Sequence, residues 1–194
     1  LGAFTVDQIA SLSIEDVKVL NSDQVRALSA DQLAGLSTSQ IQALSSANVS
    51  QLKTEQLNAL NTAQIKAMTS LQIKALTSTQ LNVLVTEDLQ AIDASDIAAI
   101  DAATIGALTT DQLTSLTTAQ IKALTSAEVR AISSTKIAAL KSEQIKSLST
   151  TVLATLTADQ ILKIDPAKIS TLDTSQIKAF GTAQVRALTS DQLN

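Results

Sequence analysis

The sequence repeats every eight residues, with no insertion or deletion. Every eighth residue from Ile9 to Leu193 is Ile, Val or Leu, which gives 24 positions. A second series runs from Phe4 to Leu188, and all 24 of its members are Leu, Ile, Met or Phe. A fixed period of this kind is typical of repeat architectures, in which each unit is stabilised by its neighbours. Each eight-residue unit is called an octad below.

Neither a continuous α-helix nor a β-solenoid explains this period. Eight residues at about 100° each advance about 800°, so an apolar stripe on one helix drifts by roughly 80° per octad. Coiled coils keep their apolar seam with repeats of seven or eleven residues. In a β-strand, apolar positions three and five residues apart fall on opposite faces. Four glycines in 194 residues are also few for tight β corners.

The residue after each member of the second series indicates a helix start. It is Ser, Thr, Asn or Asp in 20 of 24 octads, as at Thr5, Ser13 and Asn21. These residues are preferred at the N-cap, because their side-chain oxygens accept N–H groups of the first turn. Three residues later Gln occurs in 15 octads and Glu128 in one more, which completes the capping box. Each octad is therefore predicted to form one short helix of roughly two turns.

Charge follows the same register. All 18 acidic residues lie at the cap or in the next three positions, and 10 of the 14 bases follow the buried apolar position. Acid at the start and base at the end complement the helix dipole. Pro166 directly follows the cap Asp165, at the first helical position, where proline is well tolerated.

These features predict an all-α fold, an α-solenoid or superhelix of short capped helices with one helix per octad. Residues 1–194 are expected to be a single continuous array and a window of a longer one. The number of octads per superhelical turn and the handedness are left open. Octads that lack the consensus cap or glutamine, at Val85, Lys141, Lys136 and Val152, are expected to be locally weaker.

Composition excludes several kinds of chemistry. The chain contains no His, Cys, Trp or Tyr, so no thiolate or imidazole is available for nucleophilic catalysis, soft-metal ligation or proton transfer. The net charge of −4 argues against a phosphate-binding surface and hence against nucleic acid as a partner. No apolar run reaches the roughly 18–20 residues that span a bilayer. We expect no enzymatic activity, no cofactor, no membrane insertion, and no catalytic, cofactor-binding or metal-ligating residues.

Acidic and basic residues each offer a candidate binding or catalytic site. An acidic cluster, comprising Glu87, Asp88, Asp93, Asp96 and Asp101, could suggest calcium, but the cap register explains it and no glycine-containing calcium loop accompanies it. A paired-carboxylate hydrolase needs an acid in an apolar pocket, whereas the register places every acid at an exposed helix start. The basic pairs Lys18 with Arg26 and Lys66 with Lys74 are interpreted as a solvated face.

Two further surface features remain open at this stage. Double hydroxyls recur at the cap and the next position, as at Thr109-Thr110 and Thr117-Thr118. Such a series could bind ice or glycans or accept O-glycans, although capping and solubility also explain it. Several larger apolar residues lie outside the two core series. Five of them are expected at the surface, namely Leu71, Val83, Val85, Val152 and Leu162.

The octad from Leu116 to Leu124 resembles degenerate repeat arrays of very large bacterial secreted and surface proteins of the adhesin type. This resemblance implies an extracellular or cell-surface structural segment. The stretch from Leu20 to Val25 is also similar to the start of a TAL effector repeat, but the base-reading loop of that longer repeat has no counterpart here.

We therefore expect a structural repeat protein, an extracellular rod, stalk or filament-forming segment. Self-association into a fibre and cell-surface or matrix partners are compatible with this expectation. The alternative is a binding module that uses its repeated Ser/Thr surface for ice, glycan or a partner protein.

Overall fold

The computed structural model describes residues 3–193, and this part of the chain consists of 24 short α-helices joined by corners, without a β-strand. One helix forms in each octad, as the sequence predicts, and each has four to six residues. The all-α solenoid of capped helices is therefore confirmed.

One octad shows how the chain turns. Ser45 caps the helix that follows it, and its side chain accepts a hydrogen bond from the backbone N–H of Asn48. The preceding residue, Leu44, has φ −63° and ψ 139°, and Ser45 has φ −67° and ψ 153°. Two consecutive extended residues therefore make the corner. No described residue has a positive φ, so these corners need no glycine.

The chain forms two compact units, of which the first ends at Ile100 and the second begins at Asp101. The eight-residue period of the sequence continues through this point without interruption. Unit 1 contains α1 (Val6–Ala10), α2 (Ile14–Lys18), α3 (Ser22–Arg26), α4 (Ala30–Ala34), α5 (Thr38–Ala43), α6 (Ser46–Ser50), α7 (Thr54–Asn58), α8 (Thr62–Ala67), α9 (Ser70–Lys74), α10 (Ser78–Val83), α11 (Thr86–Ala91) and α12 (Ala94–Ile97).

Unit 2 repeats the same design. It contains α13 (Ala102–Ala107), α14 (Thr110–Ser115), α15 (Thr118–Ala123), α16 (Ser126–Ala131), α17 (Ser134–Ala139), α18 (Ser142–Ser147), α19 (Thr150–Leu153), α20 (Ala158–Lys163), α21 (Pro166–Ile169), α22 (Thr174–Lys178), α23 (Thr182–Ala187) and α24 (Ser190–Leu193).

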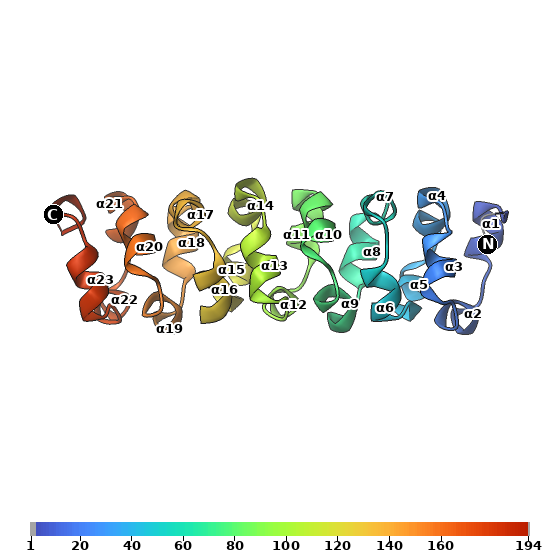
Figure 1. Cartoon of the computed structure of the whole chain (residues 1–194), viewed down its shortest axis with the longest axis horizontal. Helices are drawn as coiled ribbons and strands as arrows, with labels where there is room; N and C mark the ends of the chain where they lie inside the picture. The colour runs from blue at the N-terminus through green and yellow to red at the C-terminus, as the bar shows by residue number, and fades with distance from the viewer. Residues whose placement is uncertain (1–2, 194) are drawn as a thin grey trace. The chain divides into compact units, whose positions relative to one another are not determined.

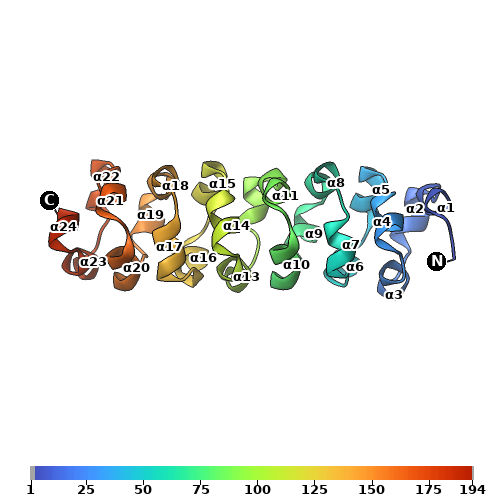
Figure 2. The same ribbon diagram turned by 90° about the horizontal axis from the view of Figure 1, so that it is seen from above.

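Within each unit every helix packs against the helix three octads further along the chain. In unit 1, α2 packs on α5, α5 on α8 and α8 on α11, and the view from above shows α5, α8 and α11 along one edge (Figure 2). In unit 2 the same relationship joins α13, α16, α19 and α22 (Figure 1). Three octads therefore complete one superhelical turn, and residues 24 positions apart occupy equivalent places in successive turns.

The core of each unit is built from the two apolar series. Members of the first series, such as Val25 and Leu57, are 0% exposed, and members of the second, such as Leu28 and Leu60, are 3–4% exposed. An isolated helix of this length is not stable in water. In most octads, burial of both residues against the neighbouring turns therefore holds the short helices together, whereas near the chain ends members of the series such as Phe4 and Val185 are exposed.

Close approach of successive turns requires small residues at one position of unit 2. A Cβ added to Gly106 on α13 would lie 2.6 Å from the carbonyl oxygen of Ala131 on α16. Glycine is required there because of the space that the neighbouring backbone leaves, and not because of its own φ.

No helix among residues 3–193 is long and apolar enough to cross a membrane.

Candidate functional site

The most regular polar feature is the glutamine at the third helical position, N3. In α7, Oε1 of Gln56 accepts a hydrogen bond of 2.9 Å from the backbone N–H of Lys53, which closes the cap of the same helix. Nε2 of Gln56 donates to the carbonyl oxygens of Val25, at 2.9 Å, and Leu28, at 2.8 Å. In the preceding turn, Val25 lies in the last turn of α3 and Leu28 lies at the corner between α3 and α4. One side chain therefore caps its own helix and bonds to another turn.

We call the bond to the carbonyl 28 residues earlier the inter-turn amide bond. Besides Gln56, it is formed by Gln32, Gln40, Gln64, Gln72 and Gln80 in unit 1 and by Gln144, Gln160, Gln176, Gln184 and Gln192 in unit 2. A helix ends with carbonyls that have no intrahelical partner, and burying them without a donor is costly. The inter-turn amide bond supplies that donor.

Burial of these glutamines follows from their double role. Gln56, Gln72 and Gln144 are each 1% exposed. Gln8 and Gln24, in the first turn of unit 1, are exposed, although Oε1 of each still accepts from its own cap residue. The inter-turn contact, and not the cap, therefore buries the side chain.

Other residues at N3 keep a donor in a different form. Lys136 donates from Nζ to the carbonyl oxygen of Gly106 at 2.8 Å, and Lys168 donates to that of Ala138. Asn48, with a shorter side chain, donates to Leu20 at 2.9 Å. The octad of Lys136, expected to be weaker, therefore retains a bond between turns.

Acidic side chains at N3 interrupt this pattern. Asp88 is 6% exposed, and Oδ1 accepts a hydrogen bond of 2.7 Å from Thr62 in the preceding turn. Glu128 is 2% exposed. The expectation that every acid lies at an exposed helix start is therefore wrong for these two residues, because the N3 side chain points between turns and not into solvent.

Glu128 carries a buried oxygen without a partner. Oε2 accepts from the backbone N–H of Thr125 at 2.5 Å, as Oε1 of a glutamine would, but Oε1 of Glu128 has no hydrogen-bond partner. Burial raises the pKa of Glu128, an effect that outweighs the hydrogen bonds from Thr125, which lower it. Protonation would give this carboxyl the donor that the glutamines have.

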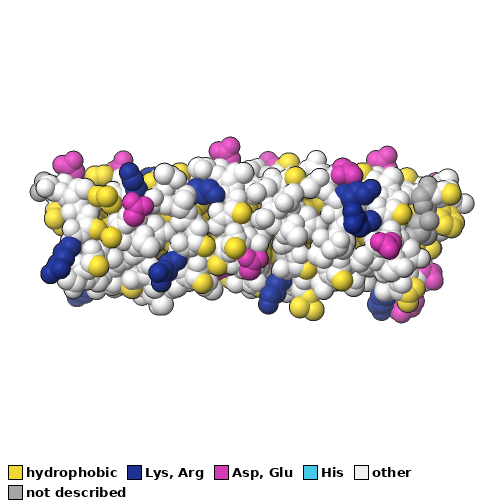
Figure 3. All heavy atoms as spheres, in the orientation of Figure 1, with side chains coloured by type: hydrophobic (Ala, Val, Ile, Leu, Met, Phe, Trp, Pro, Cys, Tyr) yellow, Lys and Arg dark blue, Asp and Glu magenta, His cyan; other side chains and the backbone are white. Residues whose placement is uncertain are grey.

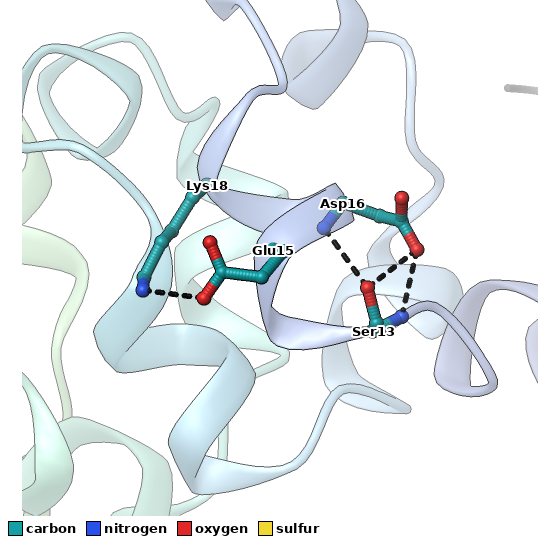
Figure 4. A network of polar contacts seen from close by, with 4 residues as sticks. All are labelled: Ser13, Glu15, Asp16 and Lys18. Atoms are coloured by element: carbon teal, nitrogen blue, oxygen red, sulfur yellow. Dashed lines mark hydrogen bonds and ion pairs between the residues drawn. The ribbon is translucent and has the colours of Figure 1, made fainter.

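At two exposed helix starts, hydrogen bonds lower the pKa of an acid, in contrast to the raised pKa of Glu128. The hydroxyl of Ser13 donates to Oδ2 of Asp16 at 2.6 Å, and the backbone N–H of Ser13 donates to the same oxygen at 3.1 Å (Figure 4). These bonds lower the pKa of Asp16. Hydrogen bonds from the side chain and backbone of Thr104 lower the pKa of Asp101 in the same way. Both carboxyls are therefore stabilised as anions by capping.

The acidic cluster predicted from the sequence is spread over different faces. In unit 1, Glu87 and Asp88 belong to α11 and Asp96 belongs to α12, and these two helices lie in different columns. Asp101 caps α13 and belongs to unit 2. The described residues contain no group of three or more acids, histidines or cysteines that could hold a metal ion.

The basic pairs are separated for the same reason. Lys18 lies on α2 and Arg26 on α3, and these helices belong to different columns of unit 1. Lys18 is paired with Glu15 on its own helix, with 2.8 Å between Nζ and Oε1 (Figure 4). On the face drawn in Figure 3, acidic and basic side chains stand dispersed among polar atoms of each unit.

The double hydroxyls divide into two roles. The cap hydroxyls accept backbone hydrogen bonds, as Thr109 does from Gln112 and Thr117 from Gln120. The next residue is exposed at Thr110 and Thr118 but only partly exposed at Ser78 and Ser126. In unit 1 the exposed or partly exposed Thr38, Thr62 and Thr86 occupy one column, on α5, α8 and α11.

Of the five apolar residues that the sequence analysis places at the surface, four are at or near it. Leu71, Val85 and Leu162 are 71%, 52% and 45% exposed, and Val83 is partly exposed. The expectation is wrong for Val152, which is 4% exposed because it occupies the N3 position between turns.

Sequence reasoning assigned the N3 glutamines to the cap alone and missed their inter-turn amide bond. A signal for it exists in the composition of that position. A capping box accepts Glu as readily as Gln, and the helix dipole favours Glu in the first turn. Fifteen glutamines against one glutamate therefore indicate that the amide N–H₂ is also used.

The repeated capped helix, the three-octad turn and the inter-turn amide bond define an α-solenoid repeat protein. Comparison with known families then identifies the repeat. The chain matches the ALTTAQ repeat at residues 9–46, 17–54, 49–86, 118–150 and 161–194, and it belongs to this family. No curated protein shows significant similarity to the chain.

Proposed function

We propose that this structural repeat protein serves as a stalk or filament-forming segment of a large bacterial surface or secreted protein, without enzymatic activity. The observation that carries the proposal is the inter-turn amide bond, which recurs in both units. It contributes to holding each turn to the one before it, in addition to the apolar core.

Uniformity supports this proposal further. In most octads of both units the same positions perform the same tasks, so stability is distributed along the array and no position is reserved for a distinct ligand. The dispersed charges and exposed hydroxyls give a polar surface to a chain in which 45% of residues are hydrophobic. A spacer needs these properties and no others.

Electron microscopy and surface labelling together test the proposal. Purified full-length protein is expected to appear as elongated particles or fibres, and antibodies against residues 1–194 are expected to label intact cells of the producing organism. Compact globular particles would contradict the stalk, and labelling only after cell lysis would contradict the surface location.

A second candidate function is binding through a repeated hydroxyl surface. The threonine column formed by Thr38, Thr62 and Thr86 favours it, because capping of the helix does not require a hydroxyl at this second position. The hydroxyls of Thr62 and Thr86 also donate to Asp88 and Glu87. Thermal hysteresis or a specific glycan-array signal that is lost on replacing all three by Ala would support this function. Retention of the signal in that variant would exclude this column as its source.

A further inference from the structure

We infer that residues 85–100, which contain α11 and α12, form a built-in opening point, the place at which the turns of unit 1 separate first under denaturant, heat or load. This inference concerns mechanical behaviour and is independent of where the protein resides. It rests on three observations at this one place in unit 1.

The first observation is the loss of both cap interactions. Val85 has no oxygen to accept from the first turn of α11, and the side chain of Asp93 makes no cap hydrogen bond to α12. The N–H groups of Asp88 and Asp96 instead bond to the carbonyls of Val85 and Asp93, three residues back. Caps without a side-chain bond also occur at Lys53, Lys141 and Gly181, which begin α7, α18 and α23. In those three helices, however, an N3 glutamine still accepts from the cap residue and bonds to the preceding turn.

The second observation is the loss of the inter-turn amide bond in two consecutive helices. Asp88 and Asp96 have no side-chain amide, so neither supplies the N–H₂ donor that a glutamine offers to the carbonyls 28 residues earlier, at Leu60 and Met68. The hydroxyl of Thr62 donates to Asp88, so α11 keeps one hydrogen bond to the preceding turn, in which the N3 side chain accepts instead of donating. Asp96 makes no such bond. Among the described helices only α11 and α12 lack both the cap bond and an N3 donor.

The third observation is charge. Glu87, Asp88, Asp93 and Asp96 lie in this segment, and the sequence contains no Lys or Arg between Lys74 and Lys122. Asp93 and Asp96 stand three residues apart at the start of one short helix, where like charges repel one another, and salt weakens that repulsion.

Hydrogen–deuterium exchange of the full chain tests the inference. Backbone amides of α11 and α12 are expected to exchange about tenfold faster or more than those of α8 to α10, which are nearer to a chain end but retain caps and amide bonds. Raising the ionic strength is expected to reduce the difference.

Variants separate the missing amide from the excess charge. The double substitution D88Q/D96Q supplies two donors and is expected to slow exchange in residues 85–100 to the rate of α8 to α10. The matched control E87Q/D111Q removes two charges from the same base-free stretch at exposed positions and is expected to leave exchange there fast. Equal exchange across residues 61–100 in the native chain, or equal rates in both double variants, would overturn the inference.

Discussion

Nε2 of Gln56 lies 2.8 Å from the carbonyl oxygen of Leu28, and this hydrogen bond links two successive turns of unit 1. Oε1 of the same side chain accepts from the backbone N–H of Lys53 and so caps α7. The formation of a helix and its attachment to the preceding turn are thus coupled through one amide group. This coupling distinguishes the N3 glutamine from an ordinary capping-box residue.

The substitution Q56E separates the two roles. Glutamate preserves the acceptor for the Lys53 N–H, but it places a buried carboxylate where the amide donated to Val25 and Leu28. The free energy of unfolding is expected to fall by about 1–3 kcal/mol, the cost of unpaired buried polar groups. Urea denaturation at neutral pH measures the change.

The matched control is Q24E, in the first turn of unit 1. Gln24 is exposed and its Oε1 accepts only from Asn21, so this variant is expected to change stability by less than about 0.5 kcal/mol. Equal losses in Q56E and Q24E would show that capping alone accounts for the glutamine.

Local structure was predictable because the signals are local. The cap residue, the N3 glutamine and the two apolar positions lie within one octad, so they fix where each helix begins and which side it buries. The extended corner, as at Leu44 and Ser45, follows from the cap geometry itself. These features account for the correct fold class.

The number of octads per turn was not predictable, because an eight-residue period is compatible with several superhelices. The packing of helices three octads apart decides it, through contacts such as that of Gly106 with Ala131. The burial of Asp88 and Glu128 was missed for the same reason. An N3 side chain is exposed on an isolated helix and becomes buried only where the preceding turn packs against it. Its burial therefore cannot be predicted from one octad.

The pH dependence of stability should carry a contribution from Glu128. Because its pKa in the folded chain is raised above the ordinary value of 4.5, the folded chain holds this proton more tightly than the unfolded chain. The contribution to stability is therefore full below that ordinary value and is lost as pH rises through the raised pKa. The lowered pKa values of Asp16 and Asp101 act in the opposite direction, at lower pH.

The variant E128Q isolates this contribution. It is expected to be more stable than the native chain at neutral pH, by about 1 kcal/mol or more, and the advantage should shrink as pH falls from about 7 to about 4. Chemical denaturation of both proteins across that range provides the measurement. The control E55Q changes an exposed acid, and a pH-dependent gain of equal size there would contradict the role of Glu128.

Restoring a cap at Val85 is expected to stabilise unit 1. Val85 has the extended backbone of an N-cap, with φ −70° and ψ 161°, but its side chain has no acceptor. The substitution V85T keeps the shape and adds a hydroxyl, so a gain of about 0.5–1 kcal/mol is expected. The exposed Val19, which lies at the C-cap of α2 and not at an N-cap, serves as the control, and V19T should change stability little. Equal effects of the two substitutions would show that the cap oxygen contributes nothing.

The substitution G106A tests whether packing between turns outweighs helix propensity. Alanine inside a helix is normally favoured over glycine by about 0.5–1 kcal/mol. Here the added Cβ would lie 2.6 Å from the carbonyl oxygen of Ala131, so α13 and α16 must move apart. The free energy of unfolding is therefore expected to decrease, by about 1–3 kcal/mol.

The control for this prediction is G181A, because the nearest atom to an added Cβ at Gly181 is a side-chain oxygen of Gln184 at 3.8 Å. Gly181 is the N-cap of α23, where alanine is less favourable than glycine. Thermal or urea unfolding should therefore show a loss of about 0.5–1 kcal/mol in that variant, smaller than the loss in G106A. If G106A were instead more stable than the native chain, helix propensity would dominate, and the close approach of α13 to α16 would not be required for the three-octad turn.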